Sequence, residues 1–297
     1  VPDNGGQTGG YSGGAVWQPA AVDMSRGIAY IGTGNNYTAP QSVEDCQTAA
    51  TAGQTASCFD PEDFFDTELA ININSGSVLW NKRLQGSDIW TVACSNPMSG
   101  TICPKPTGPD FDLGGSGPNL LPNMNMLAVG QKSGFLWGLD TSNGNVTWGT
   151  QVGPGSTSGG IEWGTASDGQ RVYVAISNNL HNSYKLAKNG PDISWGSWAG
   201  INAQTGEIQW QTADPTQGAA DTGAVSVANG VVYAGSYSGF MYALSANDGS
   251  VLWSFDSGGS VVDSPSIANG MLFWGSGYGR SKPGKSNNKL YAFGVPQ

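Results

Sequence analysis

Short apolar stretches recur along the chain with alternating apolar and polar positions, a period that predicts β-strands rather than helices. Each stretch ends before a Gly that stands four residues ahead of a Trp, which predicts a strand, a glycine turn and a second strand. The pairs are Gly76/Trp80, Gly144/Trp148, Gly206/Trp210 and Gly249/Trp253. A fifth copy of the first strand, at residues 291–294, is not followed by a Trp.

A further apolar strand precedes each copy, and before it we expect a Gly-rich inner strand, as in residues 13–17 and 159–163. Each unit then consists of four antiparallel strands, the organisation of a β-propeller blade. The predicted fold is therefore all-β, a β-propeller. The chain is either one propeller domain or the C-terminal five blades of a larger propeller. The expected blades lie roughly at 11–84, 114–152, 158–214, 220–257 and 260–297.

Composition supports this fold. Gly contributes 46 and Pro 16 of the 297 residues, which disfavours a helical bundle. The 11 Trp, 10 Tyr and 9 Phe provide enough apolar surface for a core, so disorder is not expected. The net charge of −10 disfavours nucleic-acid binding. No apolar run is long enough to predict a membrane span.

Cysteines and sequons point to an oxidising compartment. Cys46 and Cys58 form one close pair in the sequence, and Cys94 and Cys103 form another, both in stretches that we expect to be loops. Two local disulfides fit this spacing better than a zinc site, so we expect a secreted protein, extracellular or periplasmic. The sequons at Asn36 and Asn145 are glycosylation candidates that agree with secretion. The acidic segment 60–66 is expected to be a solvated loop, with a contribution to a calcium site as the alternative.

Four motifs, in order, carry a resemblance to a known family. They are GGAVW at 13–17, IGTGNN at 31–36, RLQGSDIW at 83–90 and QKSGF at 131–135. Together with the Gly-Trp repeat, they resemble the eight-bladed quinoprotein alcohol dehydrogenases that use pyrroloquinoline quinone (PQQ) and calcium, in the polyvinyl-alcohol-dehydrogenase-like branch. The resemblance covers about the last five of eight blades, so we expect a missing N-terminal portion rather than an open five-bladed ring. An unclosed ring would leave strand edges exposed.

The resemblance implies roles for five residues. Trp17 would lie flat under the quinone, because a large π face suits a planar cofactor. Lys132 would hydrogen-bond the quinone oxygens, and Trp163, expected on an inner strand, would line the same opening. Asn35 would supply an amide oxygen to calcium, which prefers hard oxygen ligands. Asp88 would accept the alcohol proton while hydride moves to the quinone, and it would also touch calcium.

Four of these roles have a simpler structural alternative. Trp17 would then be a packing residue, Asn35 a turn cap, Lys132 a solvated turn lysine, and Asp88 one of 17 Asp residues. In addition, the family's glutamate calcium ligand, paired cysteines and carboxylate-binding arginine belong to early blades that this chain does not contain.

The leading hypothesis is a secreted PQQ-dependent alcohol dehydrogenase that oxidises an alcohol, either a polyol or a polymeric alcohol, to a carbonyl. Its expected partners are the alcohol and an external electron acceptor, with an N-terminal chain or self-association completing the ring. The alternative is a non-catalytic extracellular propeller that binds carbohydrate or protein, or a purely structural protein, because a fold does not dictate its function.

Overall fold

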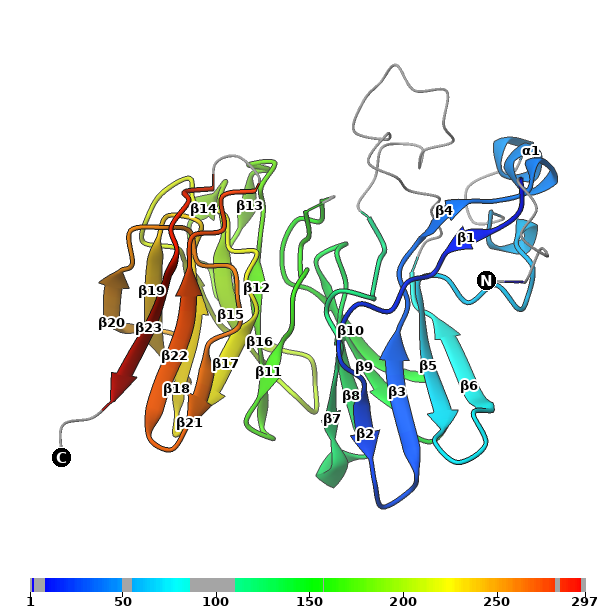
Figure 1. Ribbon diagram of the computed structural model, residues 1–297, viewed down its shortest axis with the longest axis horizontal. Coiled ribbons are helices and arrows are strands. Elements are labelled where there is room, and N and C mark those ends of the chain that lie inside the picture. The colour runs from blue at the N-terminus through cyan, green and yellow to red at the C-terminus, as the bar shows by residue number, and fades with distance from the viewer. Residues whose placement is uncertain are drawn as a thin grey trace.

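The computed structural model describes residues 2, 9–49, 55–85, 110–156, 158–280 and 284–294 (Figure 1). Among the described residues, five antiparallel sheets of three or four strands follow one another along the chain, and four of them have four strands; two further sheets have two strands each. The first contains β2 (Ala21–Asp23), β3 (Ile28–Gly32), β5 (Thr67–Asn72) and β6 (Val78–Arg83). The second contains β7 (Pro118–Leu121), β8 (Met126–Gly130), β9 (Phe135–Asp140) and β10 (Val146–Gln151), with η3 (Pro122–Met124) between β7 and β8.

The remaining three sheets continue this order. The third contains β11 (Ala166–Ser167), β12 (Arg171–Ile176), β15 (Ser197–Asn202) and β16 (Ile208–Ala213). The fourth contains β17 (Val225–Ala228), β18 (Val231–Gly235), β19 (Phe240–Ser245) and β20 (Val251–Asp256). The fifth has three strands among the described residues: β21 (Ser266–Ala268), β22 (Met271–Ser276) and β23 (Lys289–Gly294). In each sheet, consecutive strands are hydrogen-bonded neighbours, so the predicted all-β propeller fold is confirmed.

The apolar core lies between neighbouring sheets. One cluster joins the second and third sheets, with Leu136 and Ile161 packed against Val174 and Ile201. Equivalent clusters join the first sheet to the second, the third to the fourth and the fourth to the fifth. Each sheet therefore buries its apolar side chains against the next sheet rather than against a common centre.

The repeated Trp ties one sheet to the next. The indole Nε1 of Trp80 donates to the Thr141 carbonyl at 3.0 Å, and those of Trp148 and Trp210 donate to the Ala203 and Ala246 carbonyls at 3.1 and 3.0 Å. Each of these carbonyls belongs to the turn of the following sheet that contains the repeated Gly. A side chain on Gly206 would lie 2.6 Å from the Trp148 ring, so the Gly is needed for this contact as well as for its φ of +73°.

Two segments that we expected to be inner strands are loops. Of residues 13–17, only Gly13 pairs with a strand, because it ends β1 (Ser12–Gly13), which lies beside β4 (Asn36–Thr38); residues 159–163 contain no strand. Gly14 and Gly159 have φ values of +62° and +83°, which lie outside the extended region. The inner strands are instead β2 and β11, so Trp163 precedes its strand rather than lying on it.

Cys46 and Cys58 lie in helical elements rather than in the loops that we expected. Cys46 lies in a helix, α1 (Gln41–Ala49), and Cys58 ends a 3₁₀ helix, η1 (Thr55–Cys58). No Gly or Pro interrupts residues 41–49, and Pro40 precedes α1, which is a favourable helix start. The predicted Cys46–Cys58 disulfide is present, with a Cα separation of 5.7 Å.

The acidic segment 60–66 is solvated only in its first half. Residues 60–62 are exposed, as we expected, whereas Asp63 and Asp66 are fully buried. The Arg83 guanidinium lies 4.0 Å from the centroid of the Phe65 ring and donates to the Asp63 carbonyl at 2.7 Å. This contact folds the acidic segment back onto the first sheet.

Candidate functional site

Four loops meet at the end of the sheets that carries β4 and α1 (Figure 1). They comprise residues 14–17, 33–35, 110–116 and 131–134. Backbone hydrogen bonds join them: Gly34 N donates to Ala15 O at 2.8 Å, and Lys132 N donates to Asp112 O at 3.2 Å. Three of the four motifs that we singled out in the sequence therefore lie together, although more than 100 residues separate the first from the last.

Lys132 is the centre of this site. Its side chain is buried, and Nζ lies 3.3 Å from Asp110 Oδ2 and 3.7 Å from Asp112 Oδ2. Backbone amides hold both carboxylates, because Asp112 N donates to Asp110 Oδ1 and Gly114 N donates to Asp112 Oδ1. A buried lysine between two carboxylates is a charged, preorganised group, not the solvated turn lysine of the structural alternative.

Trp17 lies beside this cluster with 39% of its surface exposed. Lys132 Nζ is 5.1 Å from the centroid of the Trp17 ring, within the range of a cation–π contact. Gly114 and Gly115 line the indole so closely that a side chain on either would overlap it or its surroundings. Trp163 meets the Trp17 ring edge-on at a centroid distance of 5.0 Å. Trp17 is thus held firmly and still presents surface to solvent.

Glu162 adds a third carboxyl group to the site. Its Oε2 is buried and receives no hydrogen bond, and its charge acts on Lys132, Asp110 and Asp112. Burial raises the pKa of Glu162 to about 7 and that of Asp112 to about 6, with Lys132 opposing both shifts. Burial alone would lower the pKa of Lys132, but Asp110, Asp112 and Glu162 together raise it. The lysine therefore stays charged at neutral pH.

Asn35 lies on the edge of the site and is buried. Its Nδ2 donates to the Asn36 carbonyl at 3.1 Å, and a side chain on the preceding Gly34 would lie 2.9 Å from Asp112 Oδ1. Asn35 and Asp112 thus offer oxygen donors from adjoining loops. Within the described ranges, no three His, Cys, Asp or Glu side chains are grouped to hold a metal ion. Calcium takes six to eight oxygens, so these residues supply only part of such a shell.

Several predicted residues are placed differently or fall outside the described part. Asp88, Cys94 and Cys103 lie outside the described residues. Asn36 is buried and its Nδ2 donates to Asp63 at 2.6 Å, so the atom that would carry a glycan is occupied inside the fold. Asn145 is exposed in a turn, where a glycan has room.

Asp110, Asp112 and Glu162 were not among the site residues that we expected from the sequence. A visible signal existed, since Asp110-Phe111-Asp112 stands just before a Gly-Gly pair and Glu162 directly precedes Trp163. Among 17 Asp residues, however, this spacing does not show which carboxylates fold toward Lys132.

Comparisons with known proteins show what the chain is similar to. The PQQ_2 family model, described as outer membrane protein assembly factor BamB, matches residues 196–293. The chain is 32% identical over 321 residues to a polyvinylalcohol dehydrogenase of Sphingopyxis sp. (strain 113P3) and 32% identical over 323 residues to one of Pseudomonas sp.. Both matches cover 98% of this chain and 46% of the relative, so the chain spans about half the length of these relatives.

A solved structure of quinohemoprotein alcohol dehydrogenase from Comamonas testosteroni has the same fold. It superposes with a TM-score of 0.65 at 16% identity, over 96% of this chain and 49% of that one. Among the described helices of this chain, none has the length and apolar character needed to cross a membrane.

Proposed function

Because this chain is related over nearly all of its length to about half of the polyvinylalcohol dehydrogenases, we propose that it is part of a secreted PQQ-dependent alcohol dehydrogenase. The observation that carries the proposal is the buried Lys132, held between Asp110 and Asp112 beside the half-exposed Trp17. These groups provide a flat apolar surface, a fixed cation and carboxylates at one place. A planar, anionic quinone needs the first two, and alcohol oxidation needs a base.

The site residues have different roles in binding the cofactor. Trp17 stacks against the quinone plane, and Trp163 fixes the orientation of Trp17. Lys132 donates hydrogen bonds to the quinone oxygens. The chemistry that PQQ would supply here is acceptance of a hydride from the alcohol carbon. Asn35 would offer an amide oxygen to calcium, with Asp112 beside it.

The proton of the alcohol passes to a carboxylate. Asp88 remains our prediction from the sequence. Asp110 and Asp112 are the carboxylates that lie beside Lys132, and the raised pKa of Asp112, about 6, suits a base that works near neutral pH.

Titration with PQQ, followed by tryptophan fluorescence in the presence of calcium, tests the binding step. We expect Trp17→Leu and Lys132→Met each to weaken PQQ binding at least tenfold. Trp253→Leu is the matched control, because Trp253 is 37% exposed and lies on β20, away from the four loops. Equal binding by all three variants would contradict the proposed site, and no binding by the unmodified protein would favour the non-catalytic propeller.

A dye-linked assay with polyvinyl alcohol and smaller secondary alcohols tests the reaction. Asp88→Asn, Asp110→Asn and Asp112→Asn should each be assayed beside their PQQ affinities. The variant that loses turnover by a factor of 100 or more while still binding PQQ identifies the base. If all three variants retain full turnover, the proposed chemistry is wrong.

We also propose that a further chain segment or a second copy completes the ring, since the relatives are about twice as long as this chain. An external electron acceptor then completes the reaction. Native mass spectrometry with calcium and PQQ would detect both the assembly and the bound cofactor. A purely monomeric species without adducts would count against this proposal.

A further inference from the structure

A second pair of carboxyl groups is buried away from the site, between the third and fourth sheets. Asp214 follows β16, and Asp221 lies on the connection that leads to β17; both are almost completely buried. Both acids lie against Gly196: Asp214 N donates to the Gly196 carbonyl at 3.1 Å, and a side chain on Gly196 would lie 2.4 Å from Asp221 Oδ2. Two buried carboxylates this close cannot both be ionised without a proton or a cation between them.

The hydrogen bonds around the pair are unequal. Asp214 accepts from Thr216 N at 2.6 Å, from the Tyr242 hydroxyl at 3.3 Å and from the Ser236 hydroxyl. By contrast, neither oxygen of Asp221 receives a hydrogen bond. Ser236 is close to both carboxyls, but it donates its hydrogen to Asp214. The charge is therefore stabilised on Asp214, and Asp221 is the group that needs a proton.

The second sheet shows what these positions hold elsewhere in the fold. Asp214 N donates to Gly196 O as Val152 N donates to Gly134 O, so Asp214 and Val152 are equivalent. Likewise, Asp221 N donates to Ser177 O just as Ile161 N donates to Gln131 O. The second sheet thus buries a Val and an Ile where the third buries two acids. Packing of the fold alone does not require acids here.

No charged partner compensates the pair. In the parts of the chain that the structure describes, neither Asp forms an ion pair with Lys, Arg or His. The other titratable groups that face them are Tyr184 on β13 (Tyr184–Lys185), which pairs with β14 (Asp192–Ile193), and Tyr242 on β19. Burial raises the pKa of Tyr184 and raises that of Tyr242 to about 12, so both stay neutral below pH 9.

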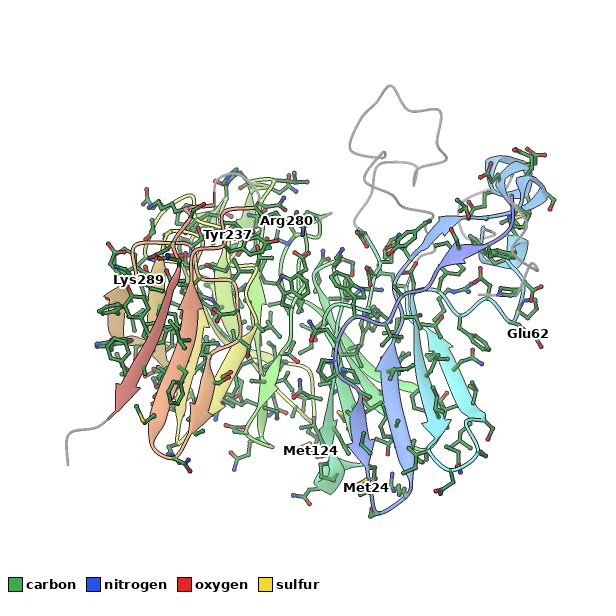
Figure 2. All side chains as sticks on the ribbon, viewed as in Figure 1. Met24, Glu62, Met124, Tyr237, Arg280 and Lys289 are labelled. Atoms are coloured by element: carbon green, nitrogen blue, oxygen red, sulfur yellow. A yellow bond between two sulfur atoms is a disulfide. The ribbon has the colours of Figure 1, made fainter. Side chains whose placement is uncertain are left out.

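The connection that carries Asp221 supports the candidate site. Ala220 packs with Tyr237 and Val262, and Trp163 packs against this group. Trp163 in turn contacts Trp17. Figure 2 shows Tyr237 at the same end of the sheets as the four loops of the site, opposite Met24 and Met124.

We propose that Asp221 keeps its proton in the folded protein and donates it to Asp214 in a hydrogen bond. This shared proton holds the connection between β16 and β17 in place, and Trp163 packs against that connection. Asp221 is thus a positioning residue for the site, and only this last step rests on the proposed function. When Asp221 loses its proton as the pH rises, two buried anions face each other and the connection loosens. Burial and the nearby Asp214 raise the pKa of Asp221 well above its ordinary value, in agreement with this assignment.

Urea unfolding between pH 4 and pH 9 tests the shared proton without any cofactor. The folded state binds one more proton than the unfolded state once the pH exceeds the ordinary Asp value of about 4. The equilibrium constant for unfolding should therefore increase with pH more steeply in the unmodified protein than in Asp221→Asn. The difference should reach at most a factor of ten per pH unit. The apolar double variant Asp214→Val with Asp221→Ile, which copies the second sheet, should share the flatter profile and should fold even if Asp221→Asn does not.

Infrared difference spectra at pH 7 give an independent measurement. The unmodified protein should show a protonated-carboxyl band that is missing in both variants. Identical pH profiles without this band would overturn the proposal. So would calcium-dependent stabilisation of the unmodified protein that both variants lose, because a cation would then replace the proton.

The link to the site is measured through Trp163, also without cofactor. Its fluorescence is obtained as the difference from Trp163→Phe. Acrylamide should quench this contribution more strongly as the pH is raised in the unmodified protein, but not in the apolar double variant. Unchanged quenching would refute the positioning role while leaving the proposed function untouched.

Discussion

At the scale of single residues, the decisive feature is the distribution of buried charge around Lys132. One cation serves Asp110, Asp112 and Glu162, and only the first two lie within ion-pair distance. Burying such a cluster costs folding free energy. It also preorganises the site, because a ligand meets charges that are already oriented. The cost of desolvating these groups is the physical reason to regard the cluster as functional rather than structural.

Lys132→Met should destabilise the protein strongly, because it leaves Asp110 and Asp112 buried without a cation. Removal of one partner of a buried pair typically costs about 3–5 kcal/mol. The loss should be largest above pH 7 and smaller near pH 5, where the carboxyls take up protons. Urea unfolding at both pH values measures this difference. Adding Asp110→Asn to Lys132→Met should restore part of the stability; if it lowers stability further, the charge argument is wrong.

At the scale of elements, the Gly-Trp repeat has a double role. Within a sheet, the Gly permits the tight turn between two strands. Between sheets, the same Gly leaves room for the Trp of the preceding sheet, as Gly206 does for Trp148. The repeat therefore forms the contact between neighbouring sheets as well as the turn within each sheet.

The chain offers a matched pair of glycines that separates the two roles. Gly76 and Gly206 both have a φ of +73°, but no atom lies within 4 Å of a side chain added at Gly76. Gly76→Ala should cost only the backbone strain, about 1 kcal/mol. Gly206→Ala should cost roughly 1–3 kcal/mol more, because the methyl group meets the Trp148 ring. Thermal or urea unfolding compares them, and equal losses would show that the Trp contact contributes nothing.

At the scale of the whole molecule, stability depends on layers between sheets, and several of these layers contain acids with raised pKa values. Asp112 and Glu162 lie where loops from neighbouring sheets meet, so they report on the assembled propeller rather than on one sheet. Because their pKa values are raised on folding, the folded state binds more protons than the unfolded state above about pH 4.

The protein should consequently lose stability as the pH rises from 5 to 8. The contribution of each of these two groups is complete below its ordinary pKa of about 4 and disappears as the pH passes about 6 for Asp112 and about 7 for Glu162. Each group contributes on the order of 3 kcal/mol at most. Urea unfolding in EDTA at several pH values should show a shallower slope for Glu162→Gln. A slope that Glu162→Gln leaves unchanged would mean that Glu162 is already ionised at pH 5.

The sequence by itself determined the repeated strands, the propeller fold, the Cys46–Cys58 pair and three of the site's motifs. These features are local or periodic: alternation marks strands, Gly marks turns, and the Gly-Trp spacing repeats in each sheet. The resemblance to the quinoprotein family, rather than the periodicity, singled out Trp17, Asn35, Lys132 and Trp163, and the structure brings them together.

Only the tertiary structure decided which carboxylates face Lys132, that Asn36 is buried, and that the segments ending at Trp17 and Trp163 are loops. The same holds for Asp214 and Asp221, which occupy positions equivalent to an apolar pair. Burial and pairing depend on contacts between loops that are distant along the chain. An Asp in the sequence has the same local pattern whether it ends in solvent or beside a buried lysine, and packing alone separates the two outcomes.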